Sequence, residues 1–177
     1  MTKRKLILIR HSQSLMIPDQ PASSWPLTTE GRARCLPLAQ KLLPYQLPRI
    51  ITSTEIKAIE TGRIIADHLQ IPCEIASGLH EHESDDKFQS RQAFLAAVNR
   101  LFAEPDRPVF GQSAHAALAR FQQAIKDVCA CYPVDNLAVV THGRVLALFL
   151  AALTEEPAVK IWPALKMPDY RIVSIYS

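Results

Sequence analysis

A short apolar run that ends abruptly in two polar side chains constrains this chain more than any other feature. Residues 6–9 are all apolar, and Arg10 and His11 follow them directly. Such a run predicts a short strand that is buried on both faces, as in a parallel sheet. Arginine and histidine leave water only at a high free-energy cost, so core packing does not explain them. Because ligands of open α/β sheets bind beyond the carboxyl ends of the strands, we expect this strand to deliver both side chains to a site.

Two further predicted strands also end in polar side chains. The apolar run 137–140 leads toward His142, and the run 49–51 leads into the hydroxyl residues 52–54 just before a helical segment. Helical segments between strands favour a parallel arrangement. The sequence therefore predicts an α/β fold in which His11 and His142 meet at one edge of a sheet.

The remaining pattern predicts one domain over residues 1–177. Hydrophobic residues make up 48% of the chain and charged residues 21%, which is typical of a soluble globular domain. Apolar spacing predicts helices near 30–43, 55–69, 88–102, 113–131, 145–153 and 157–162, and further strands at 73–76 and 170–176. Pro37 is expected to kink or split the first of these helices, and Ser53 or Thr54 is expected to cap the second.

Charge and hydropathy exclude several classes of function. The net charge is +3 and no run of like charges forms a basic arm, so nucleic acid is not an expected partner. The longest apolar stretch, 145–153, is too short to span a bilayer, and the run 6–9 is too short for the core of a signal peptide. The four cysteines form no C-x-x-C pair and indicate no metal framework. We therefore expect a cytoplasmic protein with no membrane partner.

The polar groups at the predicted strand ends suit phosphate. Arginine offers a planar fork to phosphate oxygens, and lysine offers a point charge. Lys57 lies in the first turn of the helix predicted at 55–69, where a cation opposes the helix dipole unless an anion lies in front of it; a solvated lysine is the alternative. A neutral imidazole such as that of His11 is a competent nucleophile at phosphorus, and nearby cations would lower its pKa and keep it neutral.

Six short segments, in the same order along the chain, resemble the motifs of the histidine phosphatase superfamily, which has the phosphoglycerate mutase-like fold. They lie at 10–12 (Arg-His-Ser), 27–31 (Leu-Thr-Thr-Glu-Gly), 53–61, 79–81 (Leu-His-Glu), 111–120 and 139–143 (Val-Val-Thr-His-Gly). The resemblance implies a three-layer α/β/α sandwich with a mostly parallel central sheet. It also implies a phosphohistidine mechanism that uses no metal or other cofactor.

The resemblance assigns a role to each matching position. His11 becomes the nucleophile, and Glu81 protonates the leaving oxygen and then activates water. The phosphate-binding side chains are Arg10, His11, Lys57 and His142, to which we add Ser12 beside the nucleophile. Two positions depart from the family pattern, because Lys57 replaces an arginine and Ser12 replaces a glycine. The lysine keeps the charge but loses the bidentate contact.

The loop 80–83 leaves two alternatives open. Glu83 lies close enough to Glu81 to be the acid instead, and we favour Glu81 because of the motif. The order His-Glu-His-Glu also resembles a set of zinc ligands, but the sequence offers no defined third partner, so we expect no metal. Cations near Glu81 are expected to lower its pKa, and a bound phosphate is expected to raise it again.

Two segments are expected to cover the pocket. Residues 12–26 are polar and rich in proline, which predicts a loop over the site, and 87–111 is the second expected cover. Trp25 and Trp162 could line a substrate wall, although packing is the commoner role of a tryptophan. We expect these covers to decide which substrate is accepted.

The resulting prediction is a phosphomonoesterase that acts on a small phosphorylated molecule through a phosphohistidine on His11. A mutase-type phosphoryl transfer is one alternative. A catalytically weak phosphate- or phosphopeptide-binding module and a phosphoprotein phosphatase are others, and Lys57 and Ser12 favour the weak module. No feature of the sequence indicates an oligomeric state.

Overall fold

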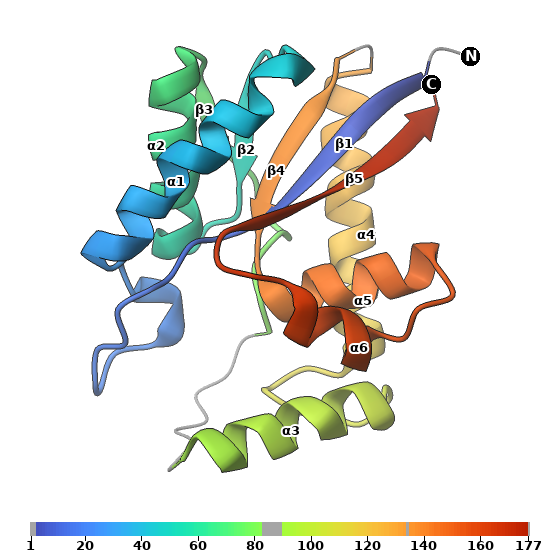
Figure 1. Ribbon diagram of the computed structural model, residues 1–177. Helices are drawn as coiled ribbons and strands as arrows, with labels where there is room; N and C mark the ends of the chain where they lie inside the picture. Colours follow the sequence, from blue (N-terminus) through green and yellow to red (C-terminus); the bar gives the residue numbers. More distant parts are fainter. Residues whose placement is uncertain (1–2, 83–89, 134, 177) are drawn as a thin grey trace.

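One or two α-helices separate each strand from the next along the chain, as the sequence predicts (Figure 1). The computed structural model describes residues 3–82, 90–133 and 135–176. The strands are β1 (Lys3–Arg10), β2 (Ile50–Thr52), β3 (Cys73–Ile75), β4 (Leu137–Thr141) and β5 (Asp169–Tyr176). The α-helices are α1 (Thr29–Leu42), α2 (Ile56–Leu69), α3 (Arg91–Ala103), α4 (Ala114–Cys131), α5 (Gly143–Leu153) and α6 (Ala158–Ala164), with short 3-10 helices η1 (Ala22–Ser24) and η2 (Leu43–Tyr45).

The strands form a five-stranded sheet in the order β3-β2-β4-β1-β5. The strands β3, β2, β4 and β1 run parallel, and β5 pairs antiparallel with β1 at the edge. The prediction of a mostly parallel sheet is thereby confirmed. The register aligns Arg10 with Thr141 and Thr52 with Val140. The residues that follow β1, β4 and β2 therefore meet at one edge of the sheet.

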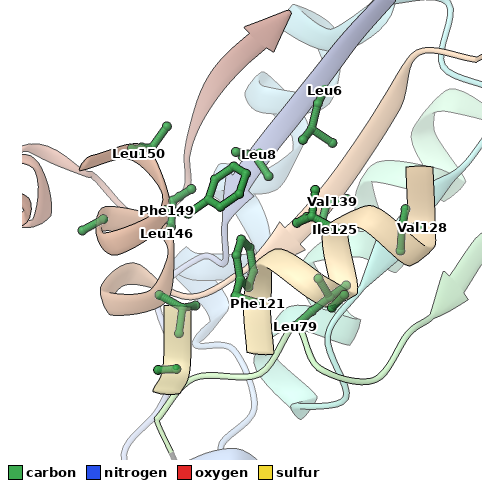
Figure 2. Close-up of a cluster of buried hydrophobic side chains, with 14 of the residues drawn as sticks. Leu6, Leu8, Leu79, Phe121, Ile125, Val128, Val139, Leu146, Phe149 and Leu150 are labelled. Carbon is green, nitrogen blue, oxygen red and sulfur yellow. The ribbon is translucent and has the colours of Figure 1, made fainter. Parts of the chain in front are cut away.

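Residues 6–9 of β1 are all apolar because each face of the sheet carries its own hydrophobic core. Residues 6–9 are all 0% exposed. Leu6 and Leu8 pack against α4 and α5 in the cluster drawn in Figure 2. Ile7 and Ile9 point to the opposite face and pack with α1 and α2. Because successive side chains of a strand alternate between two helical layers, this arrangement gives the predicted three-layer sandwich (Figure 1).

Two local predictions differ from the structure. Pro37 does not split α1, because Pro37 is exposed and water can replace the hydrogen bond that its ring removes. Glu55 occupies the N-cap position of α2, and its side chain makes no capping bond. The predicted caps, Ser53 and Thr54, lie before this position, so that prediction is wrong.

Other predicted elements recur with small shifts at their ends. The helix predicted at 88–102 is α3, which begins at Arg91 after a cap in which the Ala93 amide donates to the Ser90 hydroxyl. The first two residues of that prediction, 88–89, lie outside the described residues. Within the described part of the chain, no helix is both long and apolar enough to cross a membrane.

Candidate active site

A cavity of about 700 Å³ lies at the predicted edge of the sheet, beyond the ends of β1 and β2. One set of lining residues, the polar floor, consists of Arg10, His11, Glu55, Lys57 and Glu81. A second set, the aromatic wall, consists of Trp25, Phe94, Phe110 and Trp162. The volume falls in the range of small-molecule sites, so the cavity has room for an organic group beside a phosphate.

His11 follows the end of β1 and is 7% exposed. Its Nδ1 lies 2.7 Å from the Ser12 carbonyl oxygen, which can only accept a hydrogen bond. The hydrogen is therefore on Nδ1, and Nε2 keeps its lone pair in the neutral ring. Burial, and then the charges of His142 and Lys57, hold the pKa of His11 well below its usual range. The ring is accordingly neutral near pH 7, as a nucleophile at this position would have to be.

His142 follows the end of β4 and lies against His11. The centroids of the two rings are 5.1 Å apart, so the structure brings together the two histidines that the sequence placed at one sheet edge. His142 is 0% exposed and is not among the residues that line the cavity. Its Nε2 lies 2.5 Å from the Ser53 hydroxyl and 3.4 Å from Glu55 Oε1. Burial and the nearby Lys57 hold its pKa well below the usual range.

Lys57 lies in the first turn of α2 and is 6% exposed. The alternative of a solvated lysine is therefore wrong. Its ammonium donates to the Ala22 carbonyl oxygen at 2.6 Å and forms an ion pair with Glu55 Oε2. The anion that the sequence analysis expected in front of this lysine is thus present within the chain itself.

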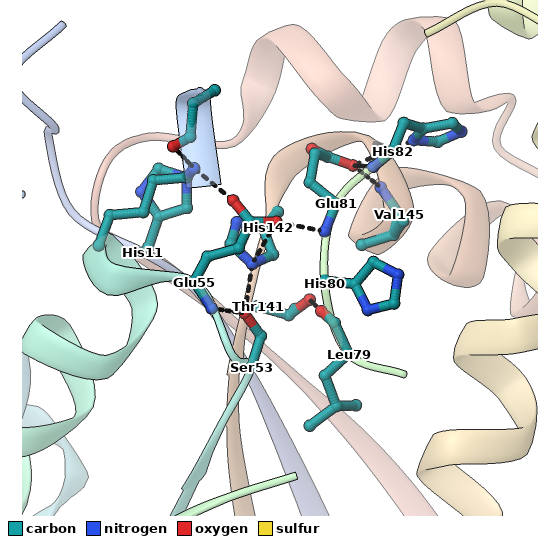
Figure 3. Close-up of polar contacts among 12 residues, drawn as sticks. His11, Ser53, Glu55, Leu79, His80, Glu81, His82, Thr141, His142 and Val145 are labelled. Atoms are coloured by element: carbon teal, nitrogen blue, oxygen red, sulfur yellow. Dashed lines mark hydrogen bonds and ion pairs between the residues drawn. The ribbon is translucent and has the colours of Figure 1, made fainter. Parts of the chain in front are cut away.

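Glu55 is the residue of the polar floor that the sequence analysis missed. Its carboxylate contacts Lys57, accepts a hydrogen bond from the Glu81 amide at 2.7 Å and reaches His142 Nε2 (Figure 3). Only the fold brings these groups together, because they come from three separate segments. A carboxylate two positions before a helical lysine was the available signal, but it is common on solvated surfaces as well.

Glu81 follows β3 in the chain, and its carboxylate lies beside the N-terminus of α5. Its carboxylate oxygens accept hydrogen bonds from the Arg144 amide at 2.8 Å and the Val145 amide at 3.1 Å, and Oε1 lies 3.1 Å from His82 Nδ1. Burial alone would raise the pKa of Glu81, but the charge of Arg144 and the bond to His82 outweigh it and hold the pKa well below its usual range. The direction of this pKa shift is the expected one, and these contacts favour the carboxylate form of Glu81.

Arg10 is fixed from two sides. Its Nη1 donates to the Leu165 carbonyl oxygen at 2.6 Å, while its buried Nε has no hydrogen-bond partner among the described residues. A Cβ atom at Gly143 would lie 2.9 Å from Cζ and Nε of Arg10. Glycine at this position therefore leaves room for the guanidinium beside the start of α5.

Ser12 does not line the cavity, although the sequence analysis placed it among the phosphate ligands. Its hydroxyl donates to the Gly31 carbonyl oxygen at 2.7 Å, and its amide donates to Thr61 Oγ1 at 3.0 Å. Both donors of Ser12 are used in tying the end of β1 to α1 and α2. We therefore remove Ser12 from the candidate phosphate ligands.

Arg120 has a positioning role. From α4, its guanidinium donates to the carbonyl oxygens of Gly78 and His80 at 2.7 Å and 2.8 Å, and to that of Glu81 at 3.3 Å. These bonds hold the loop that carries Glu81. Arg120 therefore acts on the site through the backbone and does not line the cavity.

The aromatic wall comes from both predicted covers and from α6. Trp25 belongs to the first cover, Phe94 and Phe110 to the second, and Trp162 to α6. The ring centroid of Phe94 lies 5.8 Å from that of Phe110 and 6.1 Å from that of Trp162. The guanidinium of Arg144 lies 3.9 Å from the Phe110 centroid. Both tryptophans thus line the cavity, a role that we ranked below packing.

The metal alternative involves the loop 80–83. Among the described residues, no group of three or more histidine, cysteine or acidic side chains is placed to hold a metal ion. Glu83, the alternative acid and the last of the possible ligands, lies outside the described residues.

Comparison with known proteins extends over nearly the whole chain. The family profile of the histidine phosphatase superfamily (branch 1) matches residues 6–176. The adenosylcobalamin/alpha-ribazole phosphatase of Salmonella typhimurium is 25% identical over 146 residues, which cover 77% of this chain and 71% of the relative. The 2,3-bisphosphoglycerate-dependent phosphoglycerate mutase of Gloeothece citriformis is 36% identical over 87 residues, which cover 46% of this chain and only 37% of the mutase.

Solved structures share the fold. A mycobacterial glucosyl-3-phosphoglycerate phosphatase superposes with a TM-score of 0.78 at 21% identity, covering 98% of this chain and 91% of its own. The YhfR protein of Bacillus stearothermophilus superposes with a TM-score of 0.74 at 25% identity, covering 90% and 84%. With the profile match over residues 6–176, these findings show that the chain belongs to the histidine phosphatase superfamily (branch 1).

Proposed function

We propose that this protein hydrolyses phosphomonoesters of a small molecule through a phosphohistidine on His11. The observation that carries the proposal is the state of His11, which lines the cavity as a neutral ring with its hydrogen on Nδ1. Cationic groups of Arg10 and Lys57 lie on the same cavity. The phosphatases among the relatives support the same class of reaction.

In the first step, His11 Nε2 attacks phosphorus, and an N–P bond forms as the bond to the ester oxygen breaks. The electron pair of that bond goes to the leaving oxygen, which takes a proton from Glu81. Arg10 and Lys57 stabilise the charge on the remaining phosphoryl oxygens, since preorganised cations in a buried site act strongly on developing charge.

In the second step, water attacks the phosphohistidine, Glu81 takes a proton from that water, and His11 leaves with its electron pair. Glu81 must enter the cycle protonated, yet Arg144 and His82 lower its pKa. We expect the negative charge of a bound phosphate to raise this pKa. An NMR titration of the Glu81 carboxyl with and without vanadate tests the expectation, and a pKa that fails to rise with vanadate rejects it.

The experiment that tests the function is hydrolysis of p-nitrophenyl phosphate in the presence of EDTA. Turnover should survive EDTA and should be lost in His11→Ala. His68→Ala is the matched control, because His68 is exposed in the last turn of α2 and should leave turnover intact. Turnover that persists in His11→Ala, or that EDTA abolishes, contradicts the proposal.

A catalytically weak phosphate-binding module remains the second candidate, because one observation favours it. The cation at position 57 is a lysine, and it already has an anionic partner in Glu55. Binding of inorganic phosphate without turnover by the wild-type protein would select this candidate. A mutase-type transfer has less support, since the mutase similarity covers under half of the chain.

A further inference from the structure

The carboxylate of Glu55 contacts the groups to which we assign the substrate phosphate. Its Oε2 pairs with the Lys57 ammonium, and its Oε1 accepts from the Glu81 amide at 2.7 Å and lies 3.4 Å from His142 Nε2 (Figure 3). Glu55 is 7% exposed and lines the cavity. The contacts come from α2, from the loop before α3 and from the end of β4, so they do not arise from local helix geometry.

Two anionic oxygens held by an ammonium group and a peptide N–H resemble two oxygens of a phosphoryl group in the same place. His142 itself does not line the cavity while Glu55 does. The ammonium of Lys57 also donates a hydrogen bond to the Ala22 carbonyl oxygen. A phosphate that reaches Lys57 and His142 must therefore displace the carboxylate or share both partners with a like charge, which is unfavourable.

We propose that Glu55 is an internal anion that competes with phosphate for Lys57 and His142 and thereby sets the affinity of the site. The inference rests on the proposed function, because it assumes that phosphate binds at these two residues. The Glu55 side chain makes no capping bond to α2, so it can rotate away without uncapping the helix. An incoming phosphoryl oxygen can take over the hydrogen bond of the Glu81 amide.

A positioning role for Glu55 predicts the opposite effect. If the carboxylate only holds Lys57 and the Glu81 loop in place for the substrate, its removal should weaken phosphate binding. If it competes, its removal should strengthen binding. The sign of the change therefore separates the two roles.

The experiment is calorimetric titration of inorganic phosphate into wild-type protein and Glu55→Gln, with turnover of p-nitrophenyl phosphate measured on the same samples. The amide keeps the size of the side chain and removes its charge, so we expect phosphate to bind about tenfold more tightly or better. Asp127→Asn is the matched control, since Asp127 is exposed on α4, where it accepts a hydrogen bond from the Gln123 side-chain amide. Its phosphate affinity should equal that of the wild type.

Equal or weaker phosphate binding by Glu55→Gln, with normal wild-type turnover, overturns the inference and leaves the proposed function standing. If wild-type protein and Glu55→Gln both fail to bind phosphate and to turn over p-nitrophenyl phosphate, the inference and the proposed function are both overturned. If Glu55→Gln does not fold, 13C NMR of the wild-type protein decides: the Glu55 carboxyl resonance should move on saturation with orthovanadate. An unmoved resonance in protein that binds vanadate overturns the inference.

Discussion

The polar floor and the aromatic wall of the cavity are built on different principles. The side chains of the floor are tied into hydrogen bonds, such as those of Glu81 with the first amides of α5 and of Glu55 with the Glu81 amide. Three rings of the wall are held by packing on one another, with Phe94 against both Phe110 and Trp162. A connected polar network fixes geometry and protonation, whereas ring packing fixes only shape. We infer that the floor sets the chemistry and the wall sets which organic group fits.

The comparison predicts two kinds of response to substitution. A change in the floor should affect every phosphorylated substrate, because all of them present the same phosphoryl group. A change in the wall should affect substrates according to their organic part and should leave inorganic phosphate unaffected.

The largest expected effect is that of Glu81→Gln. Loss of the acid and base should lower kcat by about 10²- to 10⁴-fold, and more for an alkyl phosphate than for p-nitrophenyl phosphate, whose leaving oxygen needs no proton. Glu74→Gln is the matched control, because Glu74 pairs with Arg49 and does not line the cavity. If Glu81→Gln keeps full activity while Glu83→Gln loses it, Glu83 is the acid.

Gly143→Ala sharpens the account of the floor. The added Cβ would lie 2.9 Å from Cζ of Arg10 and would push the guanidinium from its place. A misplaced phosphate ligand should lower kcat/KM about ten- to hundredfold for all substrates. The melting temperature should change little, because the displaced group is the end of a flexible side chain. Ala152→Ser, on the exposed part of the same helix, is the control. A Gly143→Ala variant as active as the wild type would show that Arg10 is not a phosphate ligand.

His11 and His142 should also make stability depend on pH. The folded-state pKa values of His11 and His142 lie well below the usual value, mainly through burial. As the pH falls below about 6.5, the unfolded chain binds protons that the folded chain does not, so each histidine should lower the free energy of unfolding by up to about 1.4 kcal/mol per pH unit. Urea unfolding at pH 7.5 and 5.5 measures this, above the range in which carboxylates titrate.

The slope should shrink in His142→Gln, which removes one of these two buried histidines. A free energy of unfolding that is flat or higher at pH 5.5 would show that His11 and His142 are not held neutral.

The smallest expected effect comes from the wall. Trp162→Ala should raise KM for an aryl phosphate about two- to tenfold through lost ring contact. It should leave KM for glycerol phosphate and inhibition by inorganic phosphate unchanged. A matching loss of phosphate affinity would break the distinction between wall and floor.

Most residues of the polar floor could be predicted from the sequence, because the local pattern and the sheet topology point to the same place. An apolar run that stops at Arg10–His11, and a second that stops near His142, fix where parallel strands must end. The parallel register then brings the two rings to a centroid distance of 5.1 Å. Local pattern also placed Lys57 near the site through its position in the first turn of α2.

The remaining features depend on contacts between segments that sequence patterns do not encode. Ser53 was expected to cap α2, but its hydroxyl contacts His142 Nε2 and accepts from the amide of Glu55, the residue before the helix. Ser12 was expected to face phosphate, but its hydroxyl donates to the Gly31 carbonyl oxygen. In each case several hydrogen-bond partners are possible for the hydroxyl, and tertiary packing determines which of them lie within reach. The place of Glu55 in the site could not be predicted for the same reason, because its partners lie in three segments.

The most direct test of the central claim is identification of the phosphorylated residue during turnover. Wild-type protein mixed with a phosphomonoester and quenched under alkaline conditions should carry one phosphoryl group on His11, located by mass spectrometry of its peptide. The group should be absent from His11→Ala and should accumulate in Glu81→Gln, in which its hydrolysis is slowed. Turnover with the phosphoryl group on another residue would contradict the account.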